Sequence, residues 1–230
     1  HWDGNEVWLL TAGGATFAAF PHWYATMFSG FYLALFLVLL ALIVRGVAFE
    51  FRSKDDAKWW RSLWDWMIFI GSLLPALLFG VAFANLIQGL PIEDFQYTGG
   101  LFGLLSPFTL LIGLTAVAVF LVQGATFLSL KTTGDVEKRV KALVPKLWIG
   151  AIVLVVLSAI YATFATDGIE NLGVLAWALL IFVVAVFALV GLFLKQENCG
   201  MAFIFNSLGI VGTMLAFCAV MFPRVMVSTI

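Results

Sequence analysis

The first residues read HWDGNEVWLLTAGG (1–14), so that two carboxylates, Asp3 and Glu6, and the amide of Asn5 stand at the start of an apolar helix. The sequence that follows is mostly apolar: of 230 residues, 63% are hydrophobic and only 11% are charged. Soluble domains carry about 25% charged residues. We therefore predict an all-α integral membrane protein, a polytopic helical bundle that forms a single transmembrane domain over residues 1–230. No basic patch with interleaved aromatic residues occurs, which argues against a nucleic-acid partner.

Two interpretations of the polar start are open. Asp3 and Glu6 have the spacing of a capping box, in which each side chain accepts a hydrogen bond from a free backbone N–H of the first helical turn. Alternatively, a carboxylate at the edge of the hydrocarbon is partly desolvated, and desolvation favours proton exchange near neutral pH. The second interpretation predicts a proton-handling site.

Seven segments are long enough to cross a bilayer, which takes about 20 residues each. They are 5–20, 23–49, 64–88, 101–130, 145–165, 174–194 and 200–222. The first is expected to end before Pro21, the fifth to begin at Pro145, and the seventh to end before Pro223. The chain lacks an initiator methionine, and we expect sequence to be missing at both ends.

The connections between these segments alternate in charge. Loops 50–63 and 131–146 hold nine of the 12 Lys and Arg residues, namely Arg52, Lys54, Lys58, Arg61, Lys131, Lys138, Arg139, Lys141 and Lys146. Lys and Arg collect on the cytoplasmic side of membrane proteins. Both loops are therefore predicted to be cytoplasmic, and the first segment to begin there, with Asp3 and Glu6 facing the cytoplasm.

Few side chains could hold a cofactor or a metal. The two histidines, His1 and His22, lie near segment ends, and neither cysteine has the spacing of a metal ligand. Arg45 is a cation in the apolar run LIVRGV, and it either extends to the headgroups or is buried against a carboxylate or a partner protein. We expect no catalytic residue, no metal ligand and no cofactor bound by this chain alone.

Several strings carry a resemblance to a known family. They are HWDGNEVWLLTAGGATFAAFP (1–21), FSGFYLAL (28–35), RGVAFEFRSK (45–54), WDWMIFIGSLLPALLFGVAFANLIQG (64–89), QGATFLSLKTTG (123–134) and AFCAVMFP (216–223). The chain resembles the second subunit of cytochrome bd-type quinol oxidases. The match is specific over the first 90 residues and is carried mostly by hydrophobic texture after them.

The resemblance implies a fold and a function. The family's subunit has nine helices, arranged as two four-helix bundles and one extra helix, and the seven segments would be its second to eighth. It implies a respiratory complex of the bacterial or archaeal cell membrane that oxidises quinol and reduces dioxygen to water. Haem b, haem d and the quinol site would belong to the partner, subunit I, and a further small single-helix subunit remains open.

The resemblance also assigns roles to individual residues. Asp3, with Trp2, Asn5 and Glu6 around it, matches the start of a path that carries protons from the cytoplasm to the oxygen-reducing haem, and Arg45 matches the family's intramembrane arginine. The alternative function is a self-contained polytopic transporter or channel. That class is expected to show inverted repeats, broken helices and a polar site at the midplane. The sequence contains only Pro75 as a candidate helix break and no clear repeat.

Overall fold

The computed structural model describes residues 2–93, 96–166, 172–224 and 226–227, and for Trp2, Asp3, Gln96 and Leu101 it describes the backbone alone. The described part of the chain is almost entirely helical. Its helices are α1 (Trp2–Ala19), α2 (Pro21–Gly30), α3 (Tyr32–Phe51), α4 (Lys58–Gln88), α5 (Pro107–Lys131), α6 (Asp135–Ala165), α8 (Val174–Lys195) and α9 (Cys199–Met221). A hairpin of β1 (Ile92–Glu93) and β2 (Gln96–Tyr97) and a 3₁₀ turn, η1 (Leu101–Leu104), connect α4 to α5.

Six of these eight helices are long and apolar enough to cross a membrane, namely α3, α4, α5, α6, α8 and α9. The chain is therefore a helical membrane protein, but the expected count of seven spanning helices is wrong for the described residues. Segment 5–20 corresponds to α1, whose first turns are polar and which is not among the six. Segment 23–49 is not one helix, because it is divided at Phe31 into α2 and α3.

The division at Phe31 has a local cause. The backbone of Phe31 (φ −95°, ψ 15°) departs from helical values, and its side chain is buried in an apolar cluster. Tyr97 of the hairpin packs so closely on Gly30 that a Cβ at position 30 would lie 2.9 Å from the Tyr97 Cβ. The hairpin thus fills the space at which the helix axis is interrupted.

Other helix ends differ from the expected positions for identifiable reasons. The helix expected to start at residue 101 starts at Pro107, because Ser106 accepts a hydrogen bond from the Thr109 N–H and acts as its N-cap. Helix α6 starts at Asp135 and runs through Pro145. The polar residues before Pro145 therefore belong to the helix rather than to a loop.

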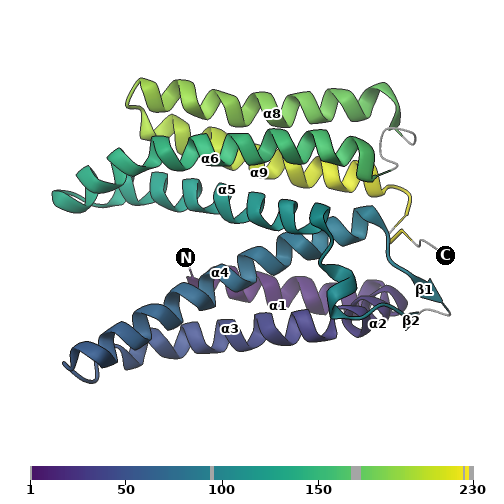
Figure 1. Ribbon diagram of the computed structural model, residues 1–230, viewed down its shortest axis with the longest axis horizontal. Coiled ribbons are helices and arrows are strands. Elements are labelled where there is room, and N and C mark those ends of the chain that lie inside the picture. The colour runs from purple at the N-terminus through teal and green to yellow at the C-terminus, as the bar shows by residue number, and fades with distance from the viewer. Residues whose placement is uncertain (1, 94–95, 167–171, 225, 228–230) are drawn as a thin grey trace.

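The helices form two groups, and α4 crosses α5 where the groups meet (Figure 1). Helices α1 to α4 lie on one side and α5, α6, α8 and α9 on the other. At the crossing of α4 and α5, a Cβ at Gly80 would lie 2.7 Å from the Gly113 Cα. Only glycine at both positions allows this approach.

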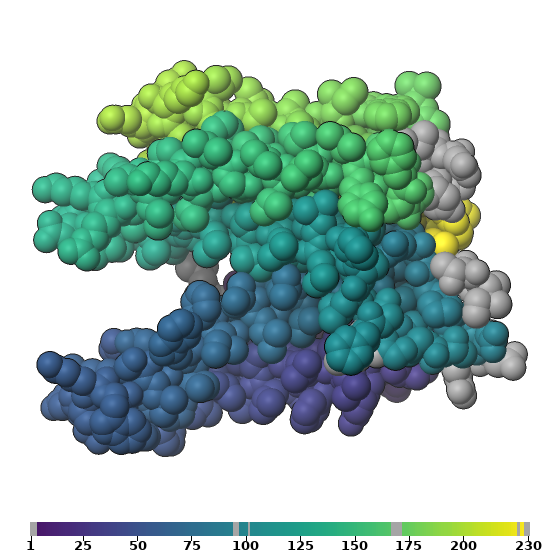
Figure 2. Space-filling view, viewed as in Figure 1, coloured from purple at the N-terminus to yellow at the C-terminus, as the bar shows by residue number. Residues whose placement is uncertain are grey.

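Away from that crossing, the two groups diverge into two arms. One arm is the α3–α4 hairpin and the other is the α5–α6 hairpin, and Figure 2 shows the molecule hollowed between them. Large apolar side chains are exposed over the outer faces of both groups, as expected of a surface that lies in lipid.

Candidate functional site

An ion pair joins the polar start of α1 to α3. The Arg45 Nη2 of α3 donates to the Glu6 Oε1 of α1 over 2.8 Å. The two side chains are 20% and 31% exposed, respectively, so the pair is partly shielded rather than fully solvated. Of the two environments open for Arg45 from the sequence, the structure has the one in which it is paired with a carboxylate.

Helix α4 also packs against Arg45. A Cβ at Gly71 would lie 2.8 Å from the Arg45 Cβ and 2.7 Å from the Ala41 carbonyl oxygen, so the absence of a side chain at position 71 lets α4 lie directly against Arg45. The Arg45 Nε is buried and has no hydrogen-bond partner among the described residues. Arg45 thus has donor capacity beyond its bond to Glu6.

Of the remaining residues of the predicted proton path, the structure describes the side chain of Asn5 but not those of Trp2 and Asp3. Asn5 is exposed on α1 beside Glu6. Trp2 and Asp3 belong to the first turn of α1, but their side chains lie outside the described residues. The structure therefore brings Glu6 and Arg45 together and leaves the positions of the Trp2 and Asp3 side chains untested.

The α3–α4 arm is closed by side chains near its tip. Arg52 donates from Nε to the Asp65 Oδ1 over 2.5 Å and from Nη2 to Oδ2 over 3.2 Å, and this bond raises the pKa of the Arg52 guanidinium. The Trp60 Nε1 donates to the Phe51 carbonyl over 2.8 Å, and Arg61 pairs with Asp56. Arg52 and Arg61, the arginines near the tip of this arm, are thus both paired with carboxylates.

The second helix group, which consists of α5, α6, α8 and α9, contains a buried amide cluster that the sequence pattern did not predict. The Asn206 side chain is 2% exposed and donates to the Gln123 Oε1 over 2.7 Å, and Gln123 donates in turn to the Ser207 Oγ over 2.7 Å. These bonds join α5 to α9. A single Asn in an apolar helix is a usable signal in the sequence, but its partner lies more than 80 positions away.

Comparison with known proteins assigns the chain to a family. A family model described as "Cytochrome bd terminal oxidase subunit II" matches residues 1–230. The chain belongs to this family. It is 38% identical to "Cytochrome bd-I ubiquinol oxidase subunit 2" of Escherichia coli (strain K12), with all of this chain and 69% of that protein covered.

Two further relatives agree. The chain is 39% identical to "Cytochrome bd ubiquinol oxidase subunit 2" of Bacillus subtilis (strain 168), with all of this chain and 68% of that protein covered. It is 39% identical to "Probable cytochrome oxidase subunit 2" of Haemophilus influenzae, with all of this chain and 69% of that protein covered. As a member of the cytochrome bd subunit II family, the chain is a membrane-integral component of a bacterial oxidoreductase complex, and the family's name implies a partner subunit.

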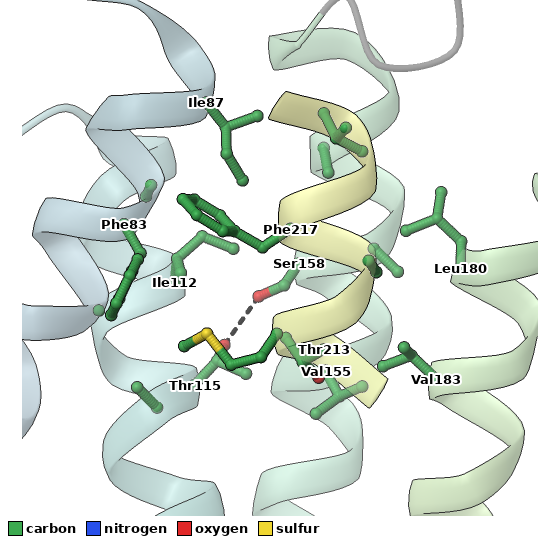
Figure 3. Close-up of a pocket in the computed structure, with 18 of the residues that line it drawn as sticks. Phe83, Ile87, Ile112, Thr115, Val155, Ser158, Leu180, Val183, Thr213 and Phe217 are labelled. Atoms are coloured by element: carbon green, nitrogen blue, oxygen red, sulfur yellow. Dashed lines mark hydrogen bonds between the residues drawn. The ribbon is translucent and has the colours of Figure 1, made fainter. Parts of the chain in front are cut away.

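A cavity in the interior of this cytochrome bd subunit is apolar (Figure 3). It has a volume of about 290 Å³ and lies between α4 and the second helix group. Its polar groups include the hydroxyls of Thr115 and Ser158, which lie 2.7 Å apart and share a hydrogen bond. No histidine and no charged side chain is among the described residues that line it. The described lining of this cavity therefore offers no titratable group to a proton path.

Proposed function

We propose that this chain is the non-haem subunit of a quinol:dioxygen oxidoreductase and that subunit I holds haem b, haem d and the quinol site. Ubiquinol oxidation is named for the Escherichia coli and Bacillus subtilis relatives. The histidines, which are common axial ligands of haem iron, support a haem-free subunit. His1 lies outside the described residues, and His22 is exposed in the first turn of α2. Replacing His22 by Ala is expected to leave the haem spectrum of the complex unchanged. Loss of one haem band at constant protein content would contradict this assignment.

The same proposal orients the chain. Residues 50–63 and 131–146, which include the first turns of α4 and α6, face the cytoplasm because they contain most of the Lys and Arg residues, and the polar start of α1 lies on that side as well. The ends of the two arms are then cytoplasmic, and the hollow between them opens to the cytoplasm.

The polar start of α1 is proposed to begin a proton-uptake path toward the partner's oxygen-reducing haem. The Glu6–Arg45 pair is the observation that carries this proposal, because it places a charged, partly shielded contact inside a candidate membrane span. Charged groups at such depth are costly and usually functional. The hydrocarbon excludes both water and isolated charge, so a buried reaction that consumes protons needs a relay of polar side chains.

The residues of the path have different roles in this proposal. Glu6 is the counter-charge of Arg45, and its protonation would leave the guanidinium without a neutralising partner. Asp3 precedes Glu6 by three residues, a spacing at which helix residues are neighbours on one face. Asp3 is therefore proposed to load and release the proton, while Glu6 and Arg45 hold α1 against α3 and set the charge next to it. Asn5 and Trp2 are proposed to line the same approach.

Oxygen consumption by the purified complex with quinol as the electron donor tests these roles. Asp3→Asn cannot ionise but keeps the size of the side chain and its capacity to accept a hydrogen bond. We expect Asp3→Asn to lose most of its turnover while its haem content is retained. Glu50→Gln is the matched control, because Glu50 is an exposed carboxylate of α3 that forms no ion pair among the described residues and has no assigned role. Full turnover in Asp3→Asn, or an equal loss in Glu50→Gln, would refute the assignment of Asp3.

A further inference from the structure

The two arms differ in net charge, although both end in a helical hairpin. Residues 50–65 contain four basic and four acidic side chains, and both arginines among them are paired with carboxylates. Residues 131–146 contain five basic and two acidic side chains, a net charge of +3. Within the described residues the only ion pair of this second arm joins Lys141 to Glu137. The α5–α6 arm therefore has cations without counter-charges, and the α3–α4 arm is balanced.

Two of these cations share one face of α6. Arg139 and Lys146 are both exposed and are seven residues apart, which is two turns or about 10 Å along the helix. Leu143 lies between them and is 48% exposed. The opposite face of the helix is packed, since Val144 is 1% exposed. Arg139 and Lys146 thus point away from the protein, with an apolar side chain between them.

After Lys146, toward the C-terminal end of α6, the exposed side chains on this face are apolar. Ile149, Val153, Leu157 and Ile160 follow at helical spacing and are each about half exposed (56%, 51%, 48% and 53%). This arrangement places the edge of the hydrocarbon near Lys146, because the basic side chains end where the exposed apolar row begins. A ligand that fits this face must be anionic at one end and a long hydrocarbon at the other.

We propose that this face of α6 binds an anionic phospholipid, with the headgroup phosphate between Arg139 and Lys146 and an acyl chain along Ile149 and Val153. Charge complementarity favours an anionic over a zwitterionic lipid, because no described carboxylate pairs with Arg139 or Lys146. The long row of apolar side chains excludes free phosphate as the ligand, since phosphate would leave that row without a partner.

Lipid retention by the purified complex tests the proposal without relying on its oxidase activity. The complex is incubated in detergent with equal amounts of phosphatidylglycerol and phosphatidylcholine, and the lipids that remain bound are quantified by mass spectrometry. We expect the native complex to retain phosphatidylglycerol preferentially. In the double variant Arg139→Gln/Lys146→Gln the preference is expected to fall by about fivefold for each charge removed. Added salt is expected to lower it in the native complex as well.

The balanced arm supplies the matched control. Lys54→Gln/Lys58→Gln removes two exposed cations of the α3–α4 arm and is expected to leave the preference unchanged. Equal retention of both lipids by the native complex, or an equal effect of both double variants, would overturn the proposal. Displacement of phosphatidylglycerol by millimolar inorganic phosphate would overturn it too, because the acyl chain would then contribute nothing. Efficient cross-linking of Ile149→Cys to the partner subunit would also overturn the proposal, because protein rather than lipid would then cover this face.

Discussion

The Glu6–Arg45 pair is expected to couple the stability of α1 to that of α3, and a double-mutant cycle measures this coupling. Glu6→Gln and Arg45→Gln each remove one charge and leave the other without its partner, whereas the double variant has no charge at either position. Each single variant is therefore expected to lose more than half of the stability that the double variant loses.

The magnitude follows from the burial of the pair. Exposed ion pairs contribute about 0–1 kcal/mol, whereas removing one partner of a fully buried pair costs about 3–5 kcal/mol. With side chains 20% and 31% exposed, Arg45 and Glu6 lie between these limits. We expect about 2 kcal/mol for each single variant and a coupling energy of about 1–2 kcal/mol.

The assay is the rate of thermal unfolding of the purified complex, because membrane complexes rarely unfold reversibly and their stability is then a rate. A loss of about 2 kcal/mol corresponds to unfolding that is up to about thirtyfold faster. The control cycle uses Glu137 and Lys141, an i,i+4 pair within α6 whose side chains are 29% and 47% exposed, for which about 0.3–0.5 kcal/mol is expected. If the effects at positions 6 and 45 add within about 0.5 kcal/mol, the two side chains do not interact, and the described pair does not hold α1 in place.

Three further predictions concern packing and orientation. Asn206→Leu removes the amide that joins α9 to α5 and is expected to destabilise the complex by about 1–2 kcal/mol, measured as faster thermal unfolding. Gly71→Ala is expected to separate α4 from α3 and to lower the assembly yield of the complex, since its Cβ would lie 2.7 Å from a backbone oxygen. Gly150→Ala is the control and should leave the yield unchanged, because nothing lies within 4 Å of its Cβ. Equal yields for the two variants would contradict the described contact at Gly71. Thr133→Cys is expected to resist an impermeant thiol reagent added outside intact cells, and labelling from outside would reverse the proposed orientation.

The sequence predicts the apolar helices better than it predicts their ends. The long apolar runs of α8 and of the second half of α4 are recognisable without a structure, because hydropathy over about 20 residues is sufficient. The polar first turns of α6 were expected to be loop, because Pro145 is typical of a helix start and hydropathy does not distinguish a solvated helical turn from a loop. The start of α5 was recoverable, since Ser106 followed by Pro107 is an N-cap signal.

The contacts between distant residues could not be predicted in this way. Glu6 and Arg45 are 39 residues apart, and Gln123 and Asn206 are 83 apart. No local periodicity reports such pairs, because they depend on how the helices cross. The sequence restricted the partner of Arg45 to headgroups, a carboxylate or another protein, and the choice of Glu6 depends on how α1 lies relative to α3.

The most direct test of the central claim is proton uptake during a single turnover. The fully reduced complex is mixed with dioxygen in the presence of a pH-indicator dye, and proton uptake and haem oxidation are followed together in the native complex and in Asp3→Asn. A proton relay through Asp3 predicts that haem oxidation begins at the native rate in Asp3→Asn while proton uptake from the solution is at least about tenfold slower, because a relay group contributes about 10²–10⁴-fold to proton transfer. Proton uptake at the native rate in Asp3→Asn, with normal haem content, would contradict it.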